Sequence, residues 1–145
     1  MPIKGNLNSK VYYTSQNGYD THDNQLNLHH RNLTELNDAV AAFYGDLKSA
    51  GLLQNVTLVV FSEFGRRVKD NGSGTDHGTA APMFIIGGGT KGRVLGGNPN
   101  LVDLDNGDLQ HEIDFRAVYA TLLRDKMGFD AKQIGITHSG LRGLF

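Results

Sequence analysis

Cysteine does not occur in this chain. Its absence excludes a disulfide framework and thiolate metal ligands, so any metal site must use histidine, aspartate or glutamate. The chain also lacks an excess of charge of either sign, because 14 basic side chains stand against 15 acidic ones and the formal net charge is -1. No overall field therefore attracts nucleic acid or anionic lipid, and we expect neither as a partner.

Long hydrophobic segments are missing as well. The first ten residues, MPIKGNLNSK, contain neither a basic stretch followed by an apolar core nor a long apolar run. We therefore expect no signal peptide and no membrane span in this chain. Its 145 residues, 39% of them apolar, fit a single globular domain, which we place at 1–145.

Two helices follow from the spacing of apolar side chains. From about residue 28, spacing of the i, i+3, i+4 type predicts a helix with one apolar stripe, which Gly51 can end. The members of this stripe are Leu33, Leu36, Val40, Phe43 and Leu47. A second amphipathic helix is predicted from Asp114, whose side chain can cap it, to Gly128.

Three strands are predicted, at 10–16, 56–61 and 83–87, together with a surface hairpin around 105–107. The runs VTLVVF and MFIIG are continuous and apolar, which is typical of strands covered on both faces. Strands that alternate with helices predict an α/β fold. Its core would be a layered, mostly parallel sheet flanked by helices, with polar loops beyond the carboxyl ends of the strands.

Three loops carry side chains suited to a divalent metal. NGYDTHD follows the first predicted strand, SEFGRR follows the second, and the last loop leads back to the third strand. Because the predicted topology brings these loops to one sheet edge, we expect their oxygen and imidazole groups to form a site for Zn, Mn or Mg. The candidate ligands are Asp20, His22, Glu63, Asp76 and His77. The alternative is that the aspartates form turns while the other side chains are ordinary surface residues.

Two arginines follow the candidate ligand Glu63. Guanidinium groups of Arg66 and Arg67 beside a metal are candidates for binding an oxyanion such as phosphate, sulfate or carboxylate, although they are equally suited to balancing local acids. No serine lies in a GxSxG elbow, so the sequence identifies no catalytic nucleophile.

Three stretches of the sequence resemble one protein family. They are GYDTHDNQ at 18–25, FSEFGRRVKDNGSGTDHGTAAPMFIIGGG at 61–89 and DLDNGDLQHEIDFRAVYATLL at 103–123. In this order they closely resemble the carboxy-terminal part of the DUF1501 proteins, a bacterial family of undefined activity related to the alkaline phosphatase and sulfatase superfamily. The resemblance covers nearly the whole chain.

The resemblance implies roles for several residues. It implies an alkaline phosphatase-like partial core in which Glu63 is a carboxylate ligand and His77 is an imidazole ligand. Asp20 and His22 look like a ligand pair supplied by the preceding loop. Phe64 stands where the superfamily has a histidine, which removes one ligand and weakens the case for a second metal.

The resemblance also implies that part of the machinery lies outside this chain. Superfamily enzymes take one metal-binding aspartate and their Ser or Thr nucleophile from an amino-terminal region, and full DUF1501 proteins are longer and often carry export signals. We therefore expect a C-terminal portion of a DUF1501-like fold, with an exported or periplasmic location for full-length members. It would be a metal-binding hydrolase-like domain acting on a small anionic ester, incomplete and weakly active or inactive alone. We expect a homo-oligomer, or a partner that supplies the missing N-terminal half. The alternative is a non-catalytic binding or scaffold domain that retains the fold.

Overall fold

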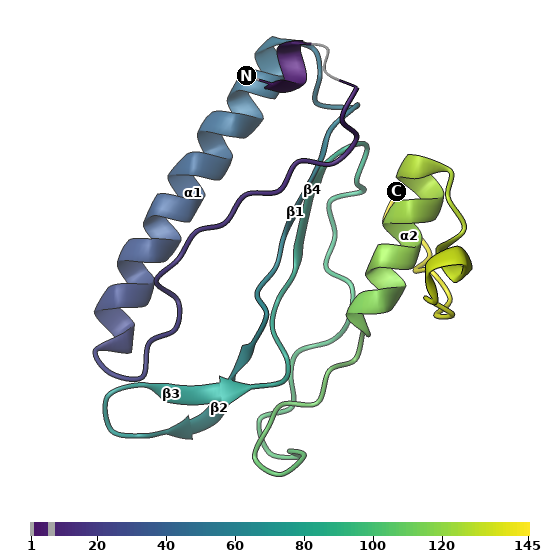
Figure 1. Ribbon diagram of the computed structural model, residues 1–145. Coiled ribbons are helices and arrows are strands. Elements are labelled where there is room, and N and C mark those ends of the chain that lie inside the picture. The colour runs from purple at the N-terminus through teal and green to yellow at the C-terminus, as the bar shows by residue number, and fades with distance from the viewer. Residues whose placement is uncertain (1, 6–7) are drawn as a thin grey trace.

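Two helices and two small β-ribbons make up the fold in a computed structural model that describes residues 2–5 and 8–145 (Figure 1). The α-helices and strands are α1 at Gln25–Ser49, β1 at Thr57–Val60, β2 at Gly65–Asp70, β3 at Thr75–Gly78, β4 at Phe84–Gly87 and α2 at Phe115–Met127. Short 3-10 helices occur at Pro2–Gly5 and Ala131–Ile134. Figure 1 shows α1 and α2 on opposite sides of the β1–β4 ribbon, with the β2–β3 hairpin at one end.

The strands form two separate antiparallel pairs. β1 pairs with β4, from Thr57 opposite Gly87 to Val60 opposite Phe84, and β2 pairs with β3. The prediction of a layered, mostly parallel sheet flanked by helices, an alkaline phosphatase-like partial core, is therefore wrong. A parallel pair needs a crossover connection, usually a helix. Here the polar segment between β1 and β4 instead folds into the β2–β3 hairpin and returns the chain in the opposite direction.

The predicted strand at 10–16 is also wrong. This segment runs as irregular backbone, and Val11 and Tyr13 are 70% and 79% exposed. β-branched and aromatic residues favour a strand only where they pack against a pleated surface, and none of the strands in the described residues pairs with this segment. The predicted hairpin at 105–107 is reduced to a single bridge between Asp105 and Asp108. Its turn residues Asn106 and Gly107 have φ of 50° and 86°, as a tight two-residue hairpin turn requires.

Both predicted helices are confirmed. α1 begins at Gln25, three residues before the predicted start at 28, and the chain leaves it through Gly51 with φ of 68°. α2 is capped as predicted, because the Asp114 carboxylate accepts a hydrogen bond from the backbone N–H of Arg116 at 2.8 Å and Gly128 ends the helix with φ of 62°.

The best-buried part of the molecule lies around α2. Ala117, Val118 and Ala120 are buried on this helix. Thr121 is fully buried, and its hydroxyl donates to Ala117 O and accepts from the Leu141 N–H at 2.7 Å, which ties the C-terminal segment to the helix. β1, expected to be covered on both faces, is only half-buried. None of the described helices is long and apolar enough to cross a membrane.

Candidate metal site

Asp20, His22 and His77 form a compact group of ligand atoms. His77 Nε2 lies 2.8 Å from Asp20 Oδ1, and His22 Nε2 lies 3.2 Å from the same oxygen. One ligand atom from each residue lies within 4.8 Å of those of the other two. All three side chains are exposed, so solvent and small molecules reach the group directly. One carboxylate and two imidazoles thus converge from segments 57 residues apart.

Arg66 on β2 joins the two segments that supply these side chains. Its guanidinium donates to Thr75 O on β3 at 2.5 Å and to Tyr19 O at 2.6 Å. It also donates to Thr21 Oγ1 at 3.2 Å. Tyr19 and Thr21 flank Asp20 in the chain, so Arg66 holds the Asp20 segment against the hairpin that carries His77.

The other side of the Asp20 segment is held by α1. The buried Thr21 hydroxyl lies 3.0 Å from His29 Nε2. The Tyr19 hydroxyl donates to Asn32 O at 3.0 Å. Burial, and then the charge of Glu35, raise the pKa of Tyr19 above its ordinary value, so this phenol stays protonated as the donor. The segment is therefore fixed on both sides although its backbone belongs to no helix or strand.

Aromatic contacts fix the plane of the His77 ring. Phe64 stacks on His77 with ring centroids 3.8 Å apart and an angle of 10° between the planes. Arg66 Cζ lies 5.2 Å from the centroid of the Phe64 ring on which it packs. The His22 ring lies 4.7 Å from the His77 ring. Phe64 thus supports a histidine of this group.

Asp76 lies behind His22. Its Oδ1 is 3.5 Å from His22 Nδ1, the ring nitrogen that does not face Asp20. Asn71 donates to Asp76 Oδ1 at 3.4 Å and to His22 O at 3.2 Å. A carboxylate on the second nitrogen of a ligand histidine orients the ring and raises its basicity. Asp76, predicted as a ligand, lies beside the His22 ring instead of among the three clustered side chains, and its role as a ligand stays a prediction.

The remaining predicted residues lie outside the group. Among the described residues, Glu63 is not one of the clustered ligands, and its side chain is exposed. Arg67 Nε lies 3.6 Å from Asp108 Oδ1. Arg66 is occupied by the three acceptors described above, so an oxyanion would have to compete with them. The roles of Glu63 as a ligand and of both arginines in oxyanion binding stay predictions.

Sequence reasoning missed two contributors to the geometry. One is His29, which is half-buried and bonded to Thr21. The other is Asn71, which bonds to His22 and Asp76; the pair Asn71-Gly72 is a turn signal that places this side chain at the β2–β3 turn. No signal in the sequence pairs His29 with Thr21, because that contact depends on how the irregular segment lies against α1.

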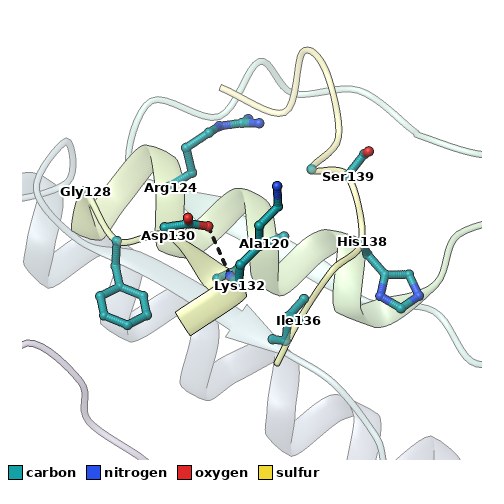
Figure 2. A pocket seen from close by; sticks show the side chains of 11 residues that line it. Ala120, Arg124, Gly128, Asp130, Lys132, Ile136, His138 and Ser139 are labelled. Atoms are coloured by element: carbon teal, nitrogen blue, oxygen red, sulfur yellow. Dashed lines mark hydrogen bonds between the residues drawn. The ribbon is translucent and has the colours of Figure 1, made fainter. Parts of the chain in front are cut away.

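A hollow lies between α2 and the C-terminal segment. It has a volume of about 500 Å³, and Figure 2 shows Arg124, His138 and Ser139 directed to different sides of it. Arg124 is paired with Asp125 at 2.6 Å, and the Asp130 carboxylate accepts from the backbone of Lys132 at 3.0 Å. The polar groups around this hollow therefore do not converge as those of the Asp20 group do.

One family model, described as "Protein of unknown function (DUF1501)", matches residues 9–143. The chain belongs to the DUF1501 family. The match includes every residue of the candidate site and both helices. A search of curated proteins and a search of solved structures gave no match to this DUF1501 chain.

Proposed function

We propose that this DUF1501 chain binds one divalent cation through Asp20, His22 and His77, as part of a hydrolase-like domain for phosphate or sulfate esters related to the alkaline phosphatase and sulfatase superfamily. The observation that carries the proposal is the convergence of three ligand atoms within 4.8 Å. Three kinds of contact hold these segments in place and support a site whose geometry is maintained. They are the hydrogen bonds of Arg66, the contacts of Tyr19 and Thr21 with α1, and the stacking of Phe64 on His77.

The donor set fits zinc. Zinc binds imidazole nitrogen and carboxylate oxygen at about 2.0–2.2 Å, so two ligand atoms of a tetrahedral site lie about 3.3 Å apart. The separations of 2.8 and 3.2 Å from Asp20 Oδ1 to His77 and His22 are near that value. Magnesium prefers oxygen ligands only and octahedral geometry, so two imidazoles favour Zn or Mn over Mg.

An open coordination position is what a hydrolase requires of such a site. Three protein ligands leave a fourth position free for substrate or water, and the exposure of the three side chains makes it accessible. When bound, the cation supplies Lewis acidity that polarises an ester oxygen. Asp20 carries the negative charge that attracts the cation. Asp76 holds the His22 imidazole, and Phe64 holds the His77 imidazole.

A non-catalytic binding or scaffold role is the second candidate, and the state of the nearby hydroxyl groups favours it. Covalent catalysis needs a nucleophile paired with a base and open to substrate. Thr21 lies beside the ligands in the chain, but its hydroxyl is buried and bonded to Arg66 and His29. The Thr79 hydroxyl donates to Leu109 O at 3.1 Å. We therefore propose metal binding with weak or no hydrolysis by this chain alone.

Calorimetric titration of protein free of affinity tags tests the proposal. We expect one zinc ion per chain, tighter than manganese, with magnesium weakest. His77→Ala removes a ligand and should weaken zinc binding by about 100-fold or more, since even loss of a residue that only orients a ligand costs 10- to 100-fold. His111→Ala is the matched control, because His111 is an exposed histidine outside the group. Absence of zinc uptake, or equal loss in both variants, contradicts the proposal.

A further inference from the structure

The chain exposes more surface than its mass requires. Its accessible surface is 10240 Å² for a mass of 15.8 kDa. A compact monomer of that mass exposes about 7,300 Å², which leaves an excess of about 2,900 Å². Permanent interfaces bury about 1,000–2,500 Å² on each partner. The excess is therefore as large as the surface that a permanent partner covers.

The β1–β4 ribbon provides an unpaired edge for such a partner. Each strand of a two-stranded antiparallel ribbon directs alternate N–H and C=O groups to its outer side. In the described part of the chain, no backbone hydrogen bond connects the outer side of β1 to another segment. A two-stranded ribbon is marginal by itself, and further strands stabilise it.

β1 lacks the features that protect an edge strand from pairing. Proteins protect such edges with charged residues, proline or irregular backbone. Thr57–Val60, with the sequence TLVV, contains none of these. β4 follows Pro82 and ends in Gly87, which has φ of 78°, and Gly88 continues with φ of 56°. Pairing is therefore favoured along β1 rather than along β4.

Apolar side chains are exposed on both faces of the ribbon. Phe84 lies opposite Val60, so the two share a face, while Phe61 follows Val60 and alternates to the other face. Phe61 is 46% exposed and Phe84 is 54% exposed. Phe61 also contacts Tyr119 of α2 edge-on, with ring centroids 6.4 Å apart. A partner beside β1 covers the apolar side chain of Phe61 as well as backbone groups, whereas Phe84 lies on β4, away from the paired edge.

We propose that a second copy of this chain pairs antiparallel with the outer edge of β1, giving a four-stranded sheet with the two β1 strands at its centre. A two-fold axis through Val59 places Val59 opposite the partner's Val59 and Leu58 opposite the partner's Val60. The same register places Thr57 opposite the partner's Phe61. The run TLVVF at 57–61 is then matched entirely by apolar residues and threonine, with no like charges facing each other. The size of the surface excess and this self-complementarity are the reasons for choosing a second copy as the occupant.

Sedimentation equilibrium from micromolar to near-millimolar concentration tests the pairing. We expect a species of about 32 kDa, twice the 15.8 kDa of one chain. Phe61→Lys places a charge beside the partner's β1 and should weaken the dimer by about tenfold or more. Phe84→Lys is the matched control on β4 and should leave the dimer unchanged. A mass of 15.8 kDa at all concentrations overturns the proposal. The same mass is expected if a different polypeptide, and not a second copy, covers this surface.

A distance measurement tests the register independently of the lysine variants. The chain has no cysteine, so a single Phe61→Cys substitution accepts one spin label per chain. In the proposed register, the two copies of position 61 are four residues apart along the paired strands, which corresponds to about 15 Å between Cα atoms. Double electron–electron resonance measures the distance between the two labels. If that distance is more than about twice the expected value, the dimer is not paired along β1 and the proposal fails.

Discussion

Replacing Arg66 tests how the proposed metal site is held together. Arg66→Gln removes the charged hydrogen bonds to Tyr19 O, Thr21 Oγ1 and Thr75 O. Hydrogen bonds from charged groups contribute about 1.5–3 kcal/mol each, and the lower value applies because Arg66 is half-buried. The two bonds to the Asp20 segment therefore represent about 3 kcal/mol of attachment. Only part of this loss reaches the metal, because a bound ion itself draws the ligands together, and we expect zinc affinity to fall by about 10- to 100-fold.

The assay combines zinc titration with amide hydrogen exchange. In Arg66→Gln, peptides covering residues 18–24 should exchange faster while peptides from α2 stay unchanged, because α2 makes no hydrogen bond to Arg66. Arg67→Gln is the matched control, since Arg67 faces Asp108 instead of the Asp20 segment. The reasoning is refuted if Arg66→Gln binds zinc as tightly as the parent chain, or if Arg67→Gln weakens binding equally.

Three further results are expected. Thr121→Val should lower the free energy of unfolding by about 1–3 kcal/mol in chemical denaturation, because it leaves the Leu141 N–H without its acceptor; no change would contradict the role of this hydrogen bond. Hydrogen bonds from Arg116 lower the pKa of Asp114 from 3.8, so the charged form stabilises the fold above that pH and the contribution is lost as the pH falls. Asp114→Asn should therefore flatten the acid side of the stability profile measured by circular dichroism, and an unchanged profile would show that this carboxylate is not responsible. With Zn, Mn or Mg supplied, hydrolysis of p-nitrophenyl phosphate and sulfate should be weak or absent; rapid turnover that disappears in His77→Ala would show that the chain is a complete enzyme.

The helices were predictable from the sequence because their signals are local. Asp114 and Gly128 are read correctly as caps, since capping depends on residues one or two positions away. The pairing of the strands was not predictable, because VTLVVF and MFIIG are equally compatible with parallel and antiparallel neighbours. The polar stretch between them determines the outcome by forming a hairpin of its own, and its charged residues gave no strand signal.

The proximity of Asp20 and His77 was predicted for a reason that the structure overturns. The prediction relied on two parallel strands ending at one sheet edge, and the first of those strands does not exist. The residues meet instead because Arg66 reaches backbone and hydroxyl oxygens of an irregular segment. Such side-chain contacts to irregular backbone have no periodicity, so spacing alone does not reveal them.

Zinc-edge anomalous diffraction from crystals grown with zinc tests the central claim most directly, because it locates the ion without assuming a substrate or an activity. We expect one strong anomalous peak per chain, about 2.0–2.2 Å from Asp20 Oδ1 and from one nitrogen each of His22 and His77. A peak at other residues, or no peak where Asp20, His22 and His77 are well ordered, would contradict the claim that these three side chains form a metal site.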